Sequence, residues 1–286
     1  MIDPATVPVI LTEIGKQGVL KEIYGDLLKP GVRQVGSAIE AVLGLGDTVL
    51  WPIHLLNQRA RINLQANLES YREKMAKVPV EQVVAPVPEL AVPIIEKFSY
   101  LEDEELRELF TTLLTTASSS ETNSKAHPSF TNVISNFCPD EAQLLRNFIG
   151  TRAIPFVYVR YVNALKDRFT QVCDMHVRVR DGVRLAFREN LSAYISNLEG
   201  LGILKIDRNT FTLDEDQYSV LVDDVKRAFA NYDAPAGYPI QQINKGRIDV
   251  TDYGQMFIST CVVIEGAGNL SADSHIVDDV NVRSTI

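Results

Sequence analysis

The stretch that decides the fold runs from Glu102 to Ser118 and reads EDEELRELFTTLLTTAS. Its leucines and phenylalanine recur at the spacing of an α-helix, which places them on one helical face. Acidic side chains begin the stretch, where the helix dipole favours negative charge. The pattern predicts a helix over residues 102–118 with a buried apolar face. The members of this face are Leu106, Leu109, Phe110, Leu113 and Leu114.

Helical patterns also flank this stretch. Residues 58–78 place apolar side chains at helical spacing among many charged ones. Residues 80–96 contain three prolines, so we expect only short helical pieces there. Further short helices are predicted to begin near Pro128 and Pro139. Residues 1–150 are therefore expected to form a helical domain.

The composition changes after residue 150. Residues 154–162 and 172–179 are rich in β-branched and aromatic side chains that partly alternate with polar ones, which predicts strands. Residues 203–206 and 210–213 indicate a hairpin that follows a helix, an order typical of a winged-helix module. We expect a mainly α fold of the α+β class. Its parts are a helical domain at 1–150, a mixed winged-helix-like module with an insertion at 151–264, and a mobile tail at 265–286.

The composition excludes several classes of protein. The chain has 286 residues and a formal net charge of −9, which argues against a general nucleic-acid coat. Its three cysteines form no CxxC pair and its four histidines show no HxxxH or HExxH spacing, so we expect no metal site and no disulfide framework. The amino terminus lacks a basic segment followed by an apolar run, so no signal peptide is expected. These features predict a cytoplasmic protein with reduced thiols.

The most apolar part of the chain is the segment 35–56. Glu40 and Asp47 interrupt it, and burying either carboxylate in a bilayer costs about 2.5–3.5 kcal/mol. Glycines and Pro52 also break its helical pattern. We interpret the segment as a kinked core hairpin. The alternative is a segment that enters a membrane only after a trigger.

The clearest candidate for a binding surface lies within residues 151–188. This strip contains eight basic and three acidic side chains, a local balance of +5 in an acidic chain. In contrast, residues 186–286 contain eight basic and fifteen acidic side chains, which would repel a nucleic-acid phosphate from that part of the chain. The candidates for an anion-binding or partner-binding surface are Arg160, Arg178, Arg180 and Arg184.

A second candidate motif is formed by His127, Pro128 and Phe130. The proline holds His127 extended, so its ring could cap the next helix or act as a general base. Ser129 follows, but it lacks the GxSxG context of an activated serine. The chain also lacks GxGxxG and GxxxxGK[ST] phosphate-binding motifs. We therefore expect no catalytic residues, no cofactor and no enzyme activity. A hydrolase built on His127 is the enzymatic alternative.

Six segments of the sequence form a further pattern: Leu43–Gly46 with Pro52, Glu104–Phe110 with Leu113 and Leu114, His127–Phe130, Pro139–Ala142, Ser196–Ile203 and Val250–Phe257. Together they resemble the bacterial abortive infection alpha (Abi-alpha) family, over roughly residues 30–262. The resemblance implies a role in phage defence and no established catalytic residues. We expect action through a protein partner from the host or the phage, and self-association is a further expectation. The alternative is a nucleic-acid-binding regulator of the winged-helix type.

Overall fold

The computed structural model describes residues 58–210 and 215–262. Its contacts divide the chain into two compact units, one of Met1–Pro139 with Ser259–Val263, and one of Asp140–Ile258 with Ile264–Ile286. The apolar segment 35–56 and the tail 265–286 lie outside the described residues. Among the described residues, no helix combines the length and the apolar character needed to cross a membrane.

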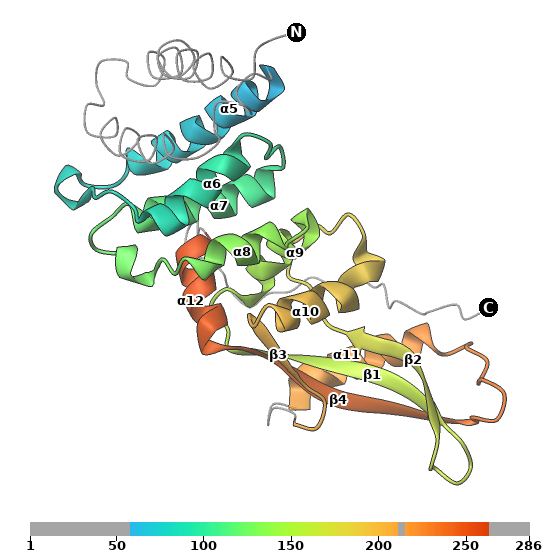
Figure 1. Ribbon diagram of the computed structural model, residues 1–286. Coiled ribbons are helices and arrows are strands. Elements are labelled where there is room, and N and C mark those ends of the chain that lie inside the picture. The colour runs from blue at the N-terminus through green and yellow to red at the C-terminus, as the bar shows by residue number, and fades with distance from the viewer. Residues whose placement is uncertain (1–57, 211–214, 263–286) are drawn as a thin grey trace, which may run out of the picture. The chain divides into compact units, whose positions relative to one another are not determined.

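The described part of the first unit is built from helices (Figure 1). The helix α7 packs against α5, α6 and α8, and the residues between these helices form the core. The elements are α5 (Gln58–Met75), the 3-10 turn η2 (Val80–Gln82), α6 (Pro88–Phe98), α7 (Glu104–Ala117), η3 (Asn123–Lys125) and α8 (Ser129–Ser135).

The helix α5 confirms the pattern at 58–78. Its apolar stripe is fully buried, and a buried amide, Asn67, crosses to the end of α6. The amide of Asn67 donates to the carbonyls of Phe98 (2.8 Å) and Leu101 (2.9 Å). Its oxygen accepts from Nε of Arg107 at 2.6 Å, so all of these buried polar atoms are satisfied. The buried residues of the stripe are Leu64, Leu68, Tyr71 and Met75.

The helix α7 confirms the predicted helix at 102–118. Asp103 is its N-cap, and its side chain accepts from the amide of Leu106 at 3.0 Å. Leu109, Phe110 and Leu113 are buried as expected. Leu106, however, is only half-buried. It lies in the first turn of the helix.

The prediction for residues 80–96 was wrong, because α6 is a continuous helix of eleven residues with Pro93 inside it. Pro88 begins the helix at a position where no amide donor is needed. Pro93 lies only five residues further on, so the single helical hydrogen bond that it removes is near the helix start. Burial of Leu90, Ile94 and Phe98 outweighs that loss.

The second unit combines helices with a curled, four-stranded antiparallel sheet in the order β2-β1-β4-β3 (Figure 1). In β1 and β4, ten residue pairs face each other, from Ala153 with Asp249 to Val162 with Ile240. The elements are α9 (Pro139–Leu144), η4 (Leu145–Phe148), β1 (Ala153–Val162), β2 (Phe169–His176), η5 (Arg188–Asn190), α10 (Leu191–Gly200), β3 (Leu204–Asp207), α11 (Glu215–Ala228), β4 (Ile240–Val250) and α12 (Asp252–Cys261).

This sheet overturns the predicted winged-helix-like module and the largely helical fold. The expected hairpin would pair residues 203–206 with 210–213, but β3 instead pairs with β4, from Leu204 with Val250 to Asp207 with Arg247. Residues 211–214 lie outside the described residues. The physical reason is the length of β4, which has eleven residues. A long strand with partners on both sides satisfies more backbone groups and buries more apolar surface than a local hairpin.

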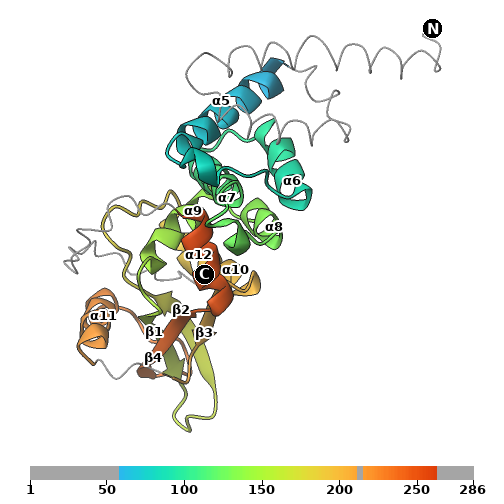
Figure 2. The ribbon, with the colours of Figure 1, turned by 90° about the vertical axis from the view of Figure 1, so that its left-hand side faces the viewer.

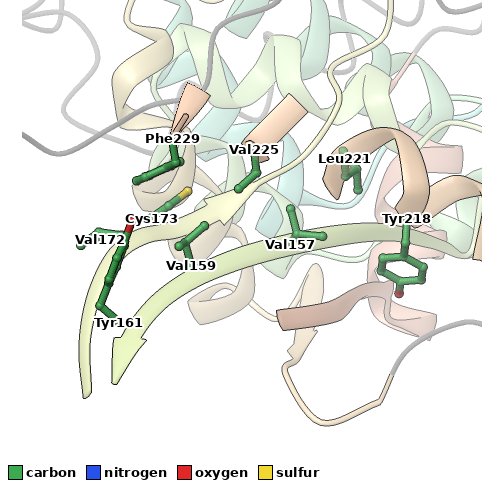
Figure 3. Packing of buried hydrophobic residues seen from close by; sticks show 9 residues of the cluster. All are labelled: Val157, Val159, Tyr161, Val172, Cys173, Tyr218, Leu221, Val225 and Phe229. Atoms are coloured by element: carbon green, nitrogen blue, oxygen red, sulfur yellow. The ribbon is translucent and has the colours of Figure 1, made fainter. Parts of the chain in front are cut away.

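The helix α11 covers one face of the sheet (Figure 2). Side chains alternate along β1, so Val157, Val159 and Tyr161 point towards α11 while their neighbours point to the opposite face. Figure 3 shows these residues packed against the apolar side of the helix. The hydroxyl of Tyr218 also donates to the carbonyl of Gly246 at 2.8 Å, which attaches α11 to β4.

Candidate partner-binding surface

The basic strip continues beyond β2 as a loop of residues 177–187, which we call the arginine loop. Side chains of the preceding helical segments hold its backbone. Oδ1 of Asn147 accepts from the amide of Arg180 at 2.8 Å, and its Nδ2 donates to the carbonyl of Arg178 at 3.3 Å. Oε1 of Gln143 accepts from the amide of Arg184 at 3.1 Å. The loop therefore has a defined conformation although it contains no helix or strand.

Asp140 is the main anchor of this loop. Its carboxylate is 5% exposed and accepts from the amides of Ala186 (2.8 Å) and Phe187 (2.9 Å) and from the hydroxyl of Tyr194 (2.9 Å). Burial raises the pKa of Asp140, but these three donors outweigh it, so the pKa lies below its ordinary value. The sequence predicted only that a short helix begins near Pro139, and gave no separate role to Asp140.

The anchored loop presents an arginine and an aromatic ring to solvent. Arg184 is exposed, and Phe187 is 59% exposed. Arg180 is half-buried, and its Nη1 donates to the carbonyl of Ile149 at 2.8 Å. Both arginines were expected from the sequence, whereas Phe187 was not. Its position next to four arginines of the strip was the available signal, since arginine and aromatic residues are enriched at interfaces.

Replacing Asp140 with asparagine is expected to lower the free energy of unfolding by about 1–3 kcal/mol at neutral pH, because buried donors lose a charged acceptor. The lowered pKa means that the carboxylate stabilises the fold fully above the ordinary aspartate value of about 4. This contribution is lost as the pH falls through the lower folded-state pKa. Urea unfolding of both proteins across this pH range measures it. A difference that persists undiminished in strong acid would contradict the anchoring role.

Arg178 has a different environment from the rest of the loop. Its Nη2 lies 3.2 Å from Oδ2 of Asp224 on α11, a carboxylate that is only 5% exposed. Arg227 and His176 contact the same carboxylate, at 2.6 Å and 3.4 Å. Burial raises the pKa of Asp224, but these neighbours outweigh it and the pKa lies below its ordinary value. Burial lowers the pKa of His176. This cluster joins β2 to α11, and it leaves Arg178 with a carboxylate partner already in place.

Arg160 lies on β1, on the face of the sheet opposite α11. Its guanidinium carbon is 4.8 Å from the ring centre of Tyr158 and 4.3 Å from that of Phe169. Within the described parts of the chain no carboxylate pairs with Arg160, and its buried Nε has no hydrogen-bond partner. Arg208, the next cation on this face, is paired with Asp174 at 3.1 Å. The structure therefore groups Arg180 and Arg184 in one loop and places Arg160 on a separate surface.

His127 lies two residues before α8 in the first unit. Its Nδ1 accepts from the amide of Ser129 at 3.2 Å and lies 2.6 Å from the hydroxyl of the same residue. Its ring packs at 5.8 Å from the ring of Phe130, which is fully buried below it. His127 and Pro128 are both exposed. In this geometry His127 makes local contacts with Ser129 and Phe130 at the start of a helix.

The described residues contain no group of three or more histidine, cysteine, aspartate or glutamate side chains arranged to hold a metal ion. Cys138, Cys173 and Cys261 form no disulfide. Burial raises the pKa of Cys261 well above its ordinary value, which keeps this thiol protonated.

The sequence of this chain matches one known protein family. The sequence description of the abortive infection alpha family matches residues 63–261, which is more than half of the 286 residues. The chain belongs to the abortive infection alpha family. The match extends over both units, from α5 to α12.

Other comparisons are less informative about this abortive infection alpha protein. No curated protein matches it. It is similar to the solved structure of an uncharacterised protein from the hydrocarbon-degrading marine bacterium Alcanivorax borkumensis SK2, with 12% sequence identity and a TM-score of 0.32. That similarity covers 50% of this chain and 96% of the other.

Two segments that resemble the family, Ser196–Ile203 and Val250–Phe257, meet in the second unit. The hydroxyl of Thr251 donates to the carbonyl of Gly202 at 2.6 Å and accepts from the amide of Gly254 at 2.8 Å. The amide of Thr251 donates to the carbonyl of Ile203 at 3.1 Å. Thr251 thus caps the start of α12 and joins it to the end of α10.

Proposed function

We propose that this abortive infection alpha protein limits phage production by binding a protein partner from the host or the phage, in the cytoplasm and without catalysing a reaction. Family membership supports the role in phage defence. The observation that carries the partner binding is the arginine loop, which exposes Arg184 and Phe187 on a backbone held by the side chains of Asp140 and Gln143.

The physical argument is that a pre-organised loop loses little conformational entropy on binding. Arginine and aromatic side chains are also the types that contribute most to interface energy. The strip around the loop has a local balance of +5, so the partner surface facing it is expected to be acidic. Asp140 supports this function indirectly, because it holds the backbone on both sides of Ala186.

Replacing Arg184 with glutamate is expected to raise the plating efficiency of a sensitive phage by about tenfold or more, because charge reversal at an interface costs several kcal/mol. A plaque assay with cells that carry the wild-type, variant or deleted gene measures this. Lys205→Glu is the matched control, because Lys205 is also exposed in the second unit but lies on β3. It should leave plating efficiency unchanged.

Two outcomes would contradict the proposal separately. Equal plating of wild-type and deleted strains across a broad phage panel would contradict the role in defence. Defence that is lost in the deletion but retained in Arg184→Glu would contradict the arginine loop as the partner surface. Filter binding with DNA and RNA over a salt series tests the alternative that the partner is a nucleic acid. Binding that weakens steeply with salt would indicate phosphate contacts and redirect the proposal to nucleic acid.

A further inference from the structure

The turn between β1 and β2 is a second exposed feature of the second unit, and we call residues 163–169 the hairpin end. In two views it projects past the other strands and α11 (Figures 1 and 2). Asn163 organises it: its amide donates to the carbonyl of Arg168 at 3.1 Å, and its Oδ1 accepts from the amides of Asp167 and Arg168 at 3.1 and 3.2 Å. Lys166 adopts a left-handed conformation with φ of 57° to complete the turn.

The hairpin end combines exposed apolar side chains with cations. Leu165 is 82% exposed and Phe169 is 54% exposed. Lys166 and Arg168 are exposed on either side of Asp167, and neither forms an ion pair with any residue in 58–210 or 215–262. Nδ2 of Asn163 lies 2.5 Å from Oδ1 of Asp167, so the single carboxylate of the turn is already bound.

Arg160 extends this cationic surface along β1. Its side chain is stacked between Tyr158 and Phe169 and has no carboxylate partner among the described residues. An apolar apex is thus surrounded by cations: Leu165 lies at the turn, Lys166 and Arg168 lie beside it, and Arg160 lies behind Phe169.

We propose that the hairpin end docks onto an anionic lipid bilayer. Leu165 and Phe169 would enter the boundary between headgroups and acyl chains, and the three cations would contact lipid phosphates. Leu165 in this turn is 82% exposed, which favours a bilayer over nucleic acid, because a phosphate backbone would leave Leu165 in water. The rigid turn reduces the entropy lost on docking.

Sedimentation of the purified full chain with vesicles tests this proposal independently of phage infection. Wild-type protein should bind vesicles of phosphatidylglycerol with phosphatidylcholine and bind pure phosphatidylcholine vesicles weakly, and added salt should reduce the binding. Both Leu165→Asp and the double variant Lys166→Glu/Arg168→Glu should lower the partition coefficient by about tenfold or more, since each removes one of the two attractions. All substituted residues are exposed, so thermal unfolding should be unchanged.

Matched controls separate the hairpin end from other membrane-binding parts of the chain. Ile62→Asp changes an exposed aliphatic residue on α5, which is 58% exposed, and Lys205→Glu changes an exposed lysine on β3. Both should bind anionic vesicles like wild type. Vesicle binding that survives both hairpin variants would overturn the proposal, as would equal binding to neutral and anionic vesicles. If the hairpin variants bound vesicles like wild type but lost binding to single-stranded RNA, the hairpin end would instead be a nucleic-acid surface.

Discussion

Replacing Gly254 with alanine is expected to destabilise the second unit by an amount near the upper end of the about 1–3 kcal/mol that overpacking costs. An added Cβ would lie 2.1 Å from the carbonyl oxygen and 3.0 Å from the carbonyl carbon of Ile203, and 3.1 Å from Cγ1 of Val250. The carbonyl belongs to the backbone, so it cannot move aside like a flexible side chain. The same carbonyl accepts from the amide of Thr251, so displacing it would also weaken the start of α12.

Gly200→Ala is the matched control for this change. Gly200 is the last residue of α10, and a Cβ added there has no atom within 4 Å. We expect this variant to be as stable as wild type or more stable by about 0.5 kcal/mol, because alanine favours a helix more than glycine does. Urea unfolding of the two variants, followed by circular dichroism, compares them. Equal stability of Gly254→Ala and Gly200→Ala would show that the contact at Ile203 is not as tight as described.

Replacing Leu109 with alanine is expected to lower the free energy of unfolding by about 2–5 kcal/mol, as for other truncations of buried leucines. Leu109 is 4% exposed on α7, which packs against α5, α6 and α8. Its neighbours are held in place by the rest of the core, so they would close the resulting cavity only partly.

Leu106→Ala provides the comparison, because Leu106 lies one turn earlier on the same helix and is only half-buried. It should cost clearly less than Leu109→Ala. Denaturant midpoints and slopes of both variants give the two free energies. A loss below about 0.5 kcal/mol for Leu109→Ala would mean that this stripe does not carry the core, since surface substitutions fall in that range.

Some elements could be predicted because their determinants are local. In α7 the period of the apolar residues, the acidic first turn and the cap at Asp103 all lie within one segment. The same holds for α5, where Leu64 and Tyr71 share a buried stripe. The strands β1 and β2 were also predicted near their observed positions, because β-branched and aromatic residues concentrate in each.

Other elements depend on partners that are distant in sequence. β3 could pair with the residues just after it or with β4. A local sequence pattern cannot distinguish these two pairings, because β4 is separated from β3 by about forty residues. The first part of β4, from Ile240 to Gly246, contains several polar residues, so its sequence lacks the pattern of a strand. This part is extended because it pairs with β1. Pro93 likewise predicts a break in α6 that burial of the helix overrides.

The candidate surfaces also depend partly on local sequence and partly on contacts between distant residues. The sequence by itself determined that residues 151–188 are basic in an acidic chain, and it supplied the family resemblance that the comparison confirmed. Only the tertiary structure decided which arginines remain available: Asp224 pairs with Arg178, whereas Arg160 is stacked between two rings and Arg184 is exposed. The reason is that charge is a property of each residue, but burial and pairing depend on which distant side chains the fold brings within a few ångströms.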